Sequence, residues 1–190
     1  ARFMSRNILR STLLCAALLA SATAAAKVEV QAVQHKSAGP ILAVNISEAI
    51  APGDYETLLK GLLANPGKFK KKLALLDNIG GSVAEAIRMG RLLRESGFDT
   101  LVPADAVCQG SCVYLLAAGR DKTVRGHVGI HRPYFANGDS AQSGNALRYS
   151  PAAYLQEMRI PASLLTDMQA VDPHNVRVLT PRELAGYRLD

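Results

Sequence analysis

The chain has 190 residues, of which 48% are hydrophobic and 20% charged, enough for one domain with a full core. Its 22 basic and 16 acidic residues give a formal net charge of +6, but three of the basic residues and none of the acids lie within the first 26 positions. Without that segment 19 basic residues face 16 acidic ones, a net charge of +3, so no binding of nucleic acid is expected.

The first 26 residues have the pattern of an export signal. Three arginines precede the apolar run "STLLCAALLASA", which is too short to span a bilayer. Small residues then offer cleavage sites after Ala24 or after Ala26, and a retained N-terminal anchor is the alternative. We therefore predict a cleaved signal peptide over 1–26, a mature domain over 27–190 without a membrane anchor, and a periplasmic or secreted protein.

Export changes the interpretation of the cysteines, because an oxidising compartment favours disulfides. Cys108 and Cys112 remain after cleavage, four residues apart. This spacing permits a bridge, and two free buried thiols are the alternative. Zinc would need further ligands that no motif of the sequence places beside these cysteines, so neither a metal nor a cofactor is expected.

Strands and helices alternate in chain order. Apolar or β-branched runs predict strands over 27–33, 40–46, 72–78, 99–104 and 126–133. Apolar residues at helical spacing predict helices over 51–65, 82–97 and 111–119. This alternation predicts an α/β fold in a single domain, with a mostly parallel sheet and flanking helices.

The pattern becomes more polar after His131. A glycine-bearing loop is predicted over 134–150, and two short helices follow, opened by Pro151 and Pro161. Thr180 and Glu183 then stand in the order of a capping box, which predicts a final helix.

Three features along the chain carry groups that acyl transfer needs. Gly80 and Gly81 form a turn after a buried strand, and their N–H groups can face an oxyanion. Ser111 lies where a loop becomes an apolar helix, and His131 lies at a strand end. Each has an ordinary explanation on its own: a tight turn, a helix N-cap and a half-buried histidine. Together they supply an oxyanion hole, a nucleophile and a general base.

The order and the flanking residues of these features carry a family resemblance. The segments "DNIGGSVAEAI", "CQGSCVYLLAAG", "VGIHRP" and "VLTPRELAGYRLD" follow one another along the chain. From about Ile41 to Asp190 the chain resembles ClpP, the proteolytic subunit of the Clp protease, and thus the ClpP/crotonase superfamily. With the export signal and the cysteines around the serine, it looks most similar to exported ClpP-like proteins of Gram-negative bacteria.

The resemblance implies a role for each matching residue. Ser111 would be the nucleophile and His131 its general base. The oxyanion hole would be formed by N–H groups of Gly81, with Gly80 as a further candidate, and of Cys112, an early helical position whose N–H is free.

The third member of the triad departs from the family pattern. The family's aspartate aligns with Val176 in this sequence. Asn175 is therefore the candidate to orient the imidazole, and Asp172 is the nearest carboxylate as an alternative. An asparagine would stabilise the imidazolium less than a carboxylate does.

The resemblance favours an enzyme, an exported serine hydrolase that cleaves short or unfolded peptides through an acyl-enzyme. It would act without an ATP-driven unfoldase, because its compartment lacks ATP. The alternative is a catalytically impaired ClpP-like fold that serves as a binding or assembly module. In ClpP the segment between the histidine and the last helix stacks two rings. Here it is short and contains Pro151 and Pro161, so a trimer or a small ring fits better than a double ring.

Two other enzyme classes compete. A Ser–Lys dyad, as in signal peptide peptidases, would need Lys122 or the lysines of 68–72, and it leaves "GIHRP" unexplained. The lysine run is predicted to be solvated surface. A crotonase-type acyl-CoA enzyme needs a cofactor that is not expected outside the cytoplasm, and it has no need of a serine nucleophile.

Overall fold

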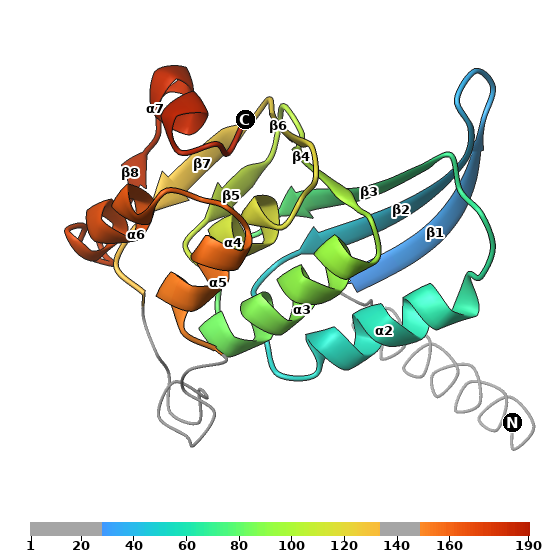
Figure 1. Ribbon diagram of the computed structural model, residues 1–190, viewed down its shortest axis with the longest axis horizontal. Helices are drawn as coiled ribbons and strands as arrows, with labels where there is room; N and C mark the ends of the chain where they lie inside the picture. The colour runs from blue at the N-terminus through green and yellow to red at the C-terminus, as the bar shows by residue number, and fades with distance from the viewer. Residues whose placement is uncertain (1–27, 134–148) are drawn as a thin grey trace, which may run out of the picture.

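The computed structural model describes residues 28–133 and 149–190 (Figure 1). The predicted signal peptide and nearly all of the predicted loop over 134–150 lie outside these residues. The described chain is a mixed α/β structure with two sheets. Within it, no helix is long and apolar enough to cross a membrane.

The larger sheet has the strand order β1-β2-β3-β4-β6. Its strands are β1 (Val28–His35), β2 (Gly39–Ser47), β3 (Lys71–Asp77), β4 (Asp99–Val102) and β6 (Lys122–Val124). The edge strand β1 is antiparallel to β2, because only a short turn joins the two, and the remaining neighbours are parallel. The sheet is thus mostly parallel.

A second, smaller sheet departs from the single sheet predicted from the sequence. It has the order β5-β7-β8 and consists of β5 (Val107–Gln109), β7 (His127–Ile130) and β8 (Arg177–Val178). Strands β5 and β7 are parallel. Beyond the end of β3, Asn78 forms a parallel bridge with Cys108 of β5. The carboxyl ends of β3, β5 and β7 therefore meet.

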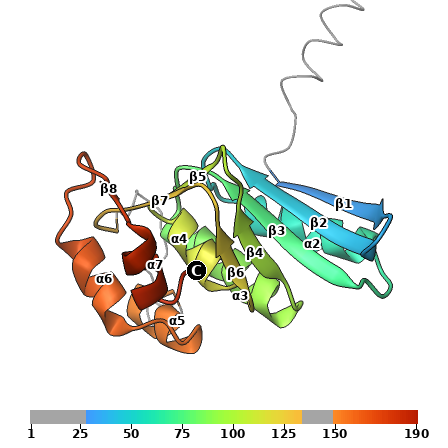
Figure 2. The same ribbon diagram turned by 90° about the horizontal axis from the view of Figure 1, so that it is seen from above.

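The helices are α2 (Asp54–Ala64), α3 (Val83–Glu95), α4 (Cys112–Ala117), α5 (Pro151–Glu157), α6 (Ala162–Gln169) and α7 (Pro181–Gly186). Figure 1 shows α2 and α3 along one face of the larger sheet, and Figures 1 and 2 both show α5, α6 and α7 gathered at the end of the molecule away from β1. Every residue of α4 is buried, as expected for a helix that is apolar on all sides. This buried helix anchors the loop that precedes it.

Helices α2 and α3 are joined through a buried carboxylate. The N-cap residue of α2, Gly53, has no side chain to cap the helix. Instead Glu85 of α3, only 6% exposed, accepts hydrogen bonds from the N–H groups of Gly53 and Tyr55 at 3.1 and 2.8 Å. A carboxylate is favourable at this positive helix end, so Glu85 caps α2 from the neighbouring helix.

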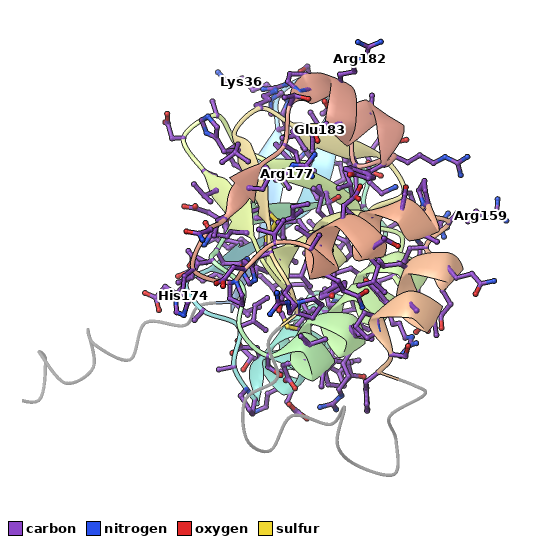
Figure 3. All side chains as sticks on the ribbon, turned by 90° about the vertical axis from the view of Figure 1, so that its left-hand side faces the viewer. Lys36, Arg159, His174, Arg177, Arg182 and Glu183 are labelled. Carbon is purple, nitrogen blue, oxygen red and sulfur yellow. A yellow bond between two sulfur atoms is a disulfide. The ribbon has the colours of Figure 1, made fainter. Side chains whose placement is uncertain are left out.

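The predicted capping box at the last helix is confirmed. The Thr180 hydroxyl accepts a hydrogen bond from the N–H of Glu183, whose carboxylate accepts one from the N–H of Thr180. Arg177 of β8 forms an ion pair with the same carboxylate, and the two side chains lie close together in Figure 3. The chain beyond α7 returns to the core at Leu189, which is fully buried.

Candidate active site

The candidate site lies where three strand ends converge. Strand β3 leads into the turn of Gly80 and Gly81, β5 leads through Gly110 to Ser111, and β7 ends directly before His131. In α/β proteins, the carboxyl ends of parallel strands are where loops bring functional groups together. The three sequence features are thus neighbours in space.

The double-glycine turn is shaped by Asn78. This side chain is 3% exposed; its Oδ1 accepts a hydrogen bond from the N–H of Gly80 at 3.1 Å, and its Nδ2 donates to the carbonyl of Ile46 at 3.3 Å. A Cβ on Gly80 would come within 2.6 Å of the Ser111 nitrogen, so the turn packs directly on the serine loop. Sequence analysis missed Asn78, although an asparagine just before a glycine turn is a recognisable signal.

Ser111 occupies a tight elbow between β5 and α4. Gly110 has a φ of +60°, a left-handed conformation that favours glycine, and its N–H donates to the carbonyl of Gly129 in β7 at 3.0 Å. Ser111 is at the N-cap position, yet its side chain forms no capping hydrogen bond. Its hydroxyl instead donates to the carbonyl of Gly81 at 2.9 Å. The hydroxyl thus faces the double-glycine turn and not its own helix.

Besides the N–H of Ser111 itself, two main-chain donors near the hydroxyl have no partner among residues 28–133 and 149–190. They are the N–H groups of Gly81 and of Cys112, the first residue of α4. The N–H of Gly80 is taken by the side chain of Asn78. Of the three predicted oxyanion donors, the geometry therefore favours Gly81 and Cys112.

The imidazole of His131 lies against the elbow. A Cβ on Gly110 would come within 2.5 Å of its Nε2, so this nitrogen faces the loop that carries Ser111. Its Nδ1 is 2.9 Å from the carbonyl oxygen of Arg132. Because a carbonyl oxygen only accepts hydrogen bonds, this contact is a hydrogen bond when Nδ1 carries the hydrogen, and in that neutral tautomer Nε2 keeps its lone pair. In the part of the chain that the structure describes, Nε2 and the Ser111 hydroxyl do not form a hydrogen bond.

The two candidates for a third triad member lie in the exposed loop before β8. The N–H of Asn175 donates to the carbonyl of Asp172 at 2.9 Å, and the carboxylate of Asp172 accepts from the N–H of His174 at 2.8 Å. Figure 3 shows the side chain of His174 pointing outward from this loop. Among the described residues, neither Asn175 nor Asp172 forms a hydrogen bond with His131.

Val176, the residue that aligns with the family's aspartate, packs against strand β7. A Cβ on Gly129 would come within 2.5 Å of Cγ1 of Val176, so the valine covers this glycine in β7. An apolar side chain there offers the imidazole no acceptor.

A disulfide links the two sides of the elbow. The sulfurs of Cys108 and Cys112 are bonded, the Cα atoms are 5.2 Å apart, and both residues are fully buried. The bridge fixes the last part of β5 to the first residue of α4, with Gly110 and Ser111 between them. It therefore restrains the hydroxyl and the N–H of Cys112, one of the two candidate oxyanion donors.

The lysines of the competing dyad lie elsewhere. Lys71 and Lys122 are the first residues of β3 and β6, at the amino ends of parallel strands. Lys122 is paired with Thr100, whose hydroxyl donates to the carbonyl of Leu116 near the far end of α4 from Ser111. Burial and the charge of Arg94 lower the pKa of Lys122. A seven-residue strand spans roughly 20 Å, so Lys71 lies far from the serine. Lys122 lies beside the opposite end of α4.

A metal site is not formed by the described residues. Within 28–133 and 149–190, no three His, Cys, Asp or Glu side chains gather in an arrangement that can hold a metal ion. The site is instead built from a hydroxyl, an imidazole and main-chain amides, which is the chemistry of nucleophilic catalysis.

No protein-family model matches the chain, and no curated protein matches it in sequence. Among solved structures, the ClpP protease catalytic domain from Plasmodium falciparum is similar to it, with a TM-score of 0.55 and 16% sequence identity. The similarity covers 78% of this chain and 81% of that chain. At this identity the similarity concerns the fold: the chain has a ClpP-like α/β fold.

Proposed function

We propose that the chain is an exported serine peptidase of the ClpP type, which cleaves short or unfolded peptides through an acyl-enzyme. The observation that carries this proposal is the convergence at one site of the Ser111 hydroxyl, the Nε2 face of His131 and the unpaired N–H groups of Gly81 and Cys112. These are the three groups that acyl transfer requires.

The reaction begins with a rotation of the Ser111 hydroxyl. At rest it donates to the carbonyl of Gly81, and turning about its χ1 brings Oγ toward Nε2 of His131. Nε2 takes the hydroxyl proton as Oγ attacks the peptide carbonyl carbon, and the new oxyanion accepts hydrogen bonds from the N–H groups of Gly81 and Cys112.

Collapse of the tetrahedral intermediate breaks the C–N bond. The imidazolium gives its proton to the leaving amine, and the acyl group stays on Ser111. Water then attacks the acyl-enzyme, losing a proton to Nε2, which returns it to the Ser111 oxygen as the acid leaves. No nucleotide or metal takes part in these steps.

The proposed compartment is the periplasm or the exterior of a Gram-negative cell. The basic and apolar start of the chain supports this, and so does the buried disulfide, because such bonds persist in oxidising spaces. Signal cleavage would leave Ala25 or Lys27 as the first residue, which N-terminal sequencing of the exported protein reads directly. We propose a trimer or small ring as the assembly.

A fluorophosphonate probe tests the catalytic proposal, because it phosphonylates only activated serines. We expect the protein to be labelled, Ser111→Ala to abolish labelling, and His131→Ala to slow it by about 10²–10⁴-fold. Lys122→Ala serves as the control for a Ser–Lys dyad and should label at the normal rate. Labelling that persists in Ser111→Ala would exclude the proposed nucleophile.

A second candidate is a binding or assembly module without hydrolytic activity. Two observations favour it: the Ser111 hydroxyl is bonded to Gly81 and not to His131, and no carboxylate contacts His131 within the described residues. This candidate requires that the folded wild-type protein resists the probe as completely as Ser111→Ala does.

A further inference from the structure

The imidazole needs an acceptor on Nδ1, and the structure provides one within the next peptide unit. In a serine triad a carboxylate orients the histidine and fixes its tautomer. Here the carbonyl oxygen of Arg132 lies 2.9 Å from Nδ1 of His131. We infer that this main-chain carbonyl orients the histidine in place of the missing carboxylate, and that Arg132 is the positioning residue that holds it there. The inference rests on the proposed function.

The peptide unit that joins His131 to Arg132 is held by the segment after α6. Its N–H donates to the carbonyl of Val171 at 2.7 Å, a short hydrogen bond. This contact ties the strand end that carries the imidazole to the chain between α6 and β8. The plane of this peptide, which directly precedes the peptide that contains the Arg132 carbonyl, is therefore set by tertiary structure and not by the loop alone.

The side chain of Arg132 adds a second anchor. Its Nε donates to the carbonyl of Gln169, the last residue of α6, at 3.2 Å. The guanidinium is favourable at this position, because the last carbonyls of a helix carry partial negative charge and lack helical partners. The side chain is thus held at the end of α6.

Pro133 supplies a third restraint. A following proline disfavours the helical region of φ and ψ, so the ψ angle of Arg132 is restricted to the extended range. That angle sets the direction of the Arg132 carbonyl. In the sequence His131-Arg132-Pro133, the histidine is thus the base and the arginine carbonyl is the acceptor that orients it. The proline ring restricts the direction of that carbonyl.

A carbonyl performs part of what a carboxylate does. It only accepts, so it selects the tautomer with hydrogen on Nδ1 and leaves the lone pair on Nε2 for the serine proton. It is neutral, so it stabilises the imidazolium through a dipole and not through a full charge. We therefore expect correct orientation of the base together with a slower reaction than that of a carboxylate triad.

Nitrogen-15 NMR of the histidine ring tests the inference without reference to activity. At a pH where the imidazole is neutral, we expect His131 to carry its hydrogen on Nδ1 in the wild type. We expect Arg132→Ala to populate both tautomers. A wild-type ring protonated on Nε2, or an unchanged tautomer in Arg132→Ala, would overturn the inference.

The rate of fluorophosphonate labelling at Ser111 provides the kinetic test. We expect Arg132→Ala to slow labelling by about 10–100-fold, because small errors in the position of a base are costly, and Arg132→Lys to restore part of the rate. The matched control is Arg125→Ala, since the Arg125 side chain is exposed and forms no hydrogen bond or ion pair within residues 28–133 and 149–190. Thermal melting of each variant establishes that it is folded.

The outcomes separate the two proposals. Labelling of the wild type at Ser111 with Arg132→Ala no slower than Arg125→Ala overturns the positioning role and leaves the peptidase intact. A larger loss in Asn175→Ala than in Arg132→Ala also overturns it, in favour of the asparagine. A folded wild type that is never labelled overturns the peptidase, and the NMR measurement then still decides how the histidine is held.

Discussion

At the scale of a single residue, Gly110 lies between Ser111, the proposed nucleophile, and His131, the proposed base. Its backbone is left-handed, with a φ of +60°, and its Cα faces the imidazole so closely that a Cβ would approach Nε2 to 2.5 Å and Cε1 to 3.0 Å. A side chain here therefore meets two separate obstacles, backbone strain and a clash with His131.

Gly110→Ala should displace the imidazole while the fold persists. We expect fluorophosphonate labelling of Ser111 to fall by about 100-fold, with a loss of about 1 kcal/mol in the free energy of unfolding from the left-handed backbone. The control is Gly97→Ala, which shares the strain at a φ of +81° but would meet no atom within 4 Å. Equal labelling of the two variants would show that the imidazole is not placed as described.

At this scale the sequence predicted the reactive groups but not the groups that hold them. Ser111, His131 and Gly81 stand in recognisable local patterns. Asn78 precedes a glycine turn, a signal that sequence reasoning passed over. Its bond to the carbonyl of Ile46, and the bonds of Arg132 to the segment after α6, join elements far apart in sequence, and no local pattern specifies such partners. The sequence already showed that Val176 aligns with the family's aspartate, whereas the packing of this valine over Gly129 depends on tertiary structure.

At the scale of elements, the position of the elbow that carries Ser111 depends on the disulfide between β5 and α4. The disulfide closes a loop of sequence separation four, so loop-closure entropy gives it a stabilisation of about 2 kcal/mol. Both sulfurs are buried, so a reductant reaches them only when the elbow opens.

Reduction should therefore lower stability and loosen the serine. We expect the melting temperature to fall by roughly 4–8 °C after reduction, together with slower labelling of Ser111. In a Cys108→Ser, Cys112→Ser double variant the reductant should have no effect. An identical melting temperature for oxidised and reduced wild type would contradict this account of the bridge.

The sequence predicted the longer strands and helices, because a long element repeats its apolar pattern often enough to be recognised. Strands β2 and β3 and helices α2 and α3 span seven residues or more and were all predicted. Strands β5, β6 and β8 have three, three and two residues, too few for a period of two to be read, so the second sheet was missed. The boundary between two sheets is set by tertiary pairing and not by local sequence.

At the scale of the whole molecule, the lengths of the helices near the C-terminus bear on how copies of the chain assemble. Between His131 and α7 the described helices are α5 and α6, with seven and eight residues. Neither is a long helix of the kind that could interlock two rings.

Light scattering of the purified protein during gel filtration measures the assembly directly. We expect the mass of a trimer or of one small ring, because neither helix described in this segment is long enough to stack two rings. A mass that matches a double ring would contradict the proposed assembly while leaving the catalytic proposal untouched.

The most direct test of the account is a crystal structure of the protein after reaction with diisopropyl fluorophosphate. We expect phosphorus bonded to Oγ of Ser111, the phosphoryl oxygen accepting hydrogen bonds from the N–H groups of Gly81 and Cys112, and Nε2 of His131 facing the ester oxygen. An unmodified Ser111, or an adduct whose phosphoryl oxygen points away from both amides, would contradict the convergence on which the proposed peptidase rests.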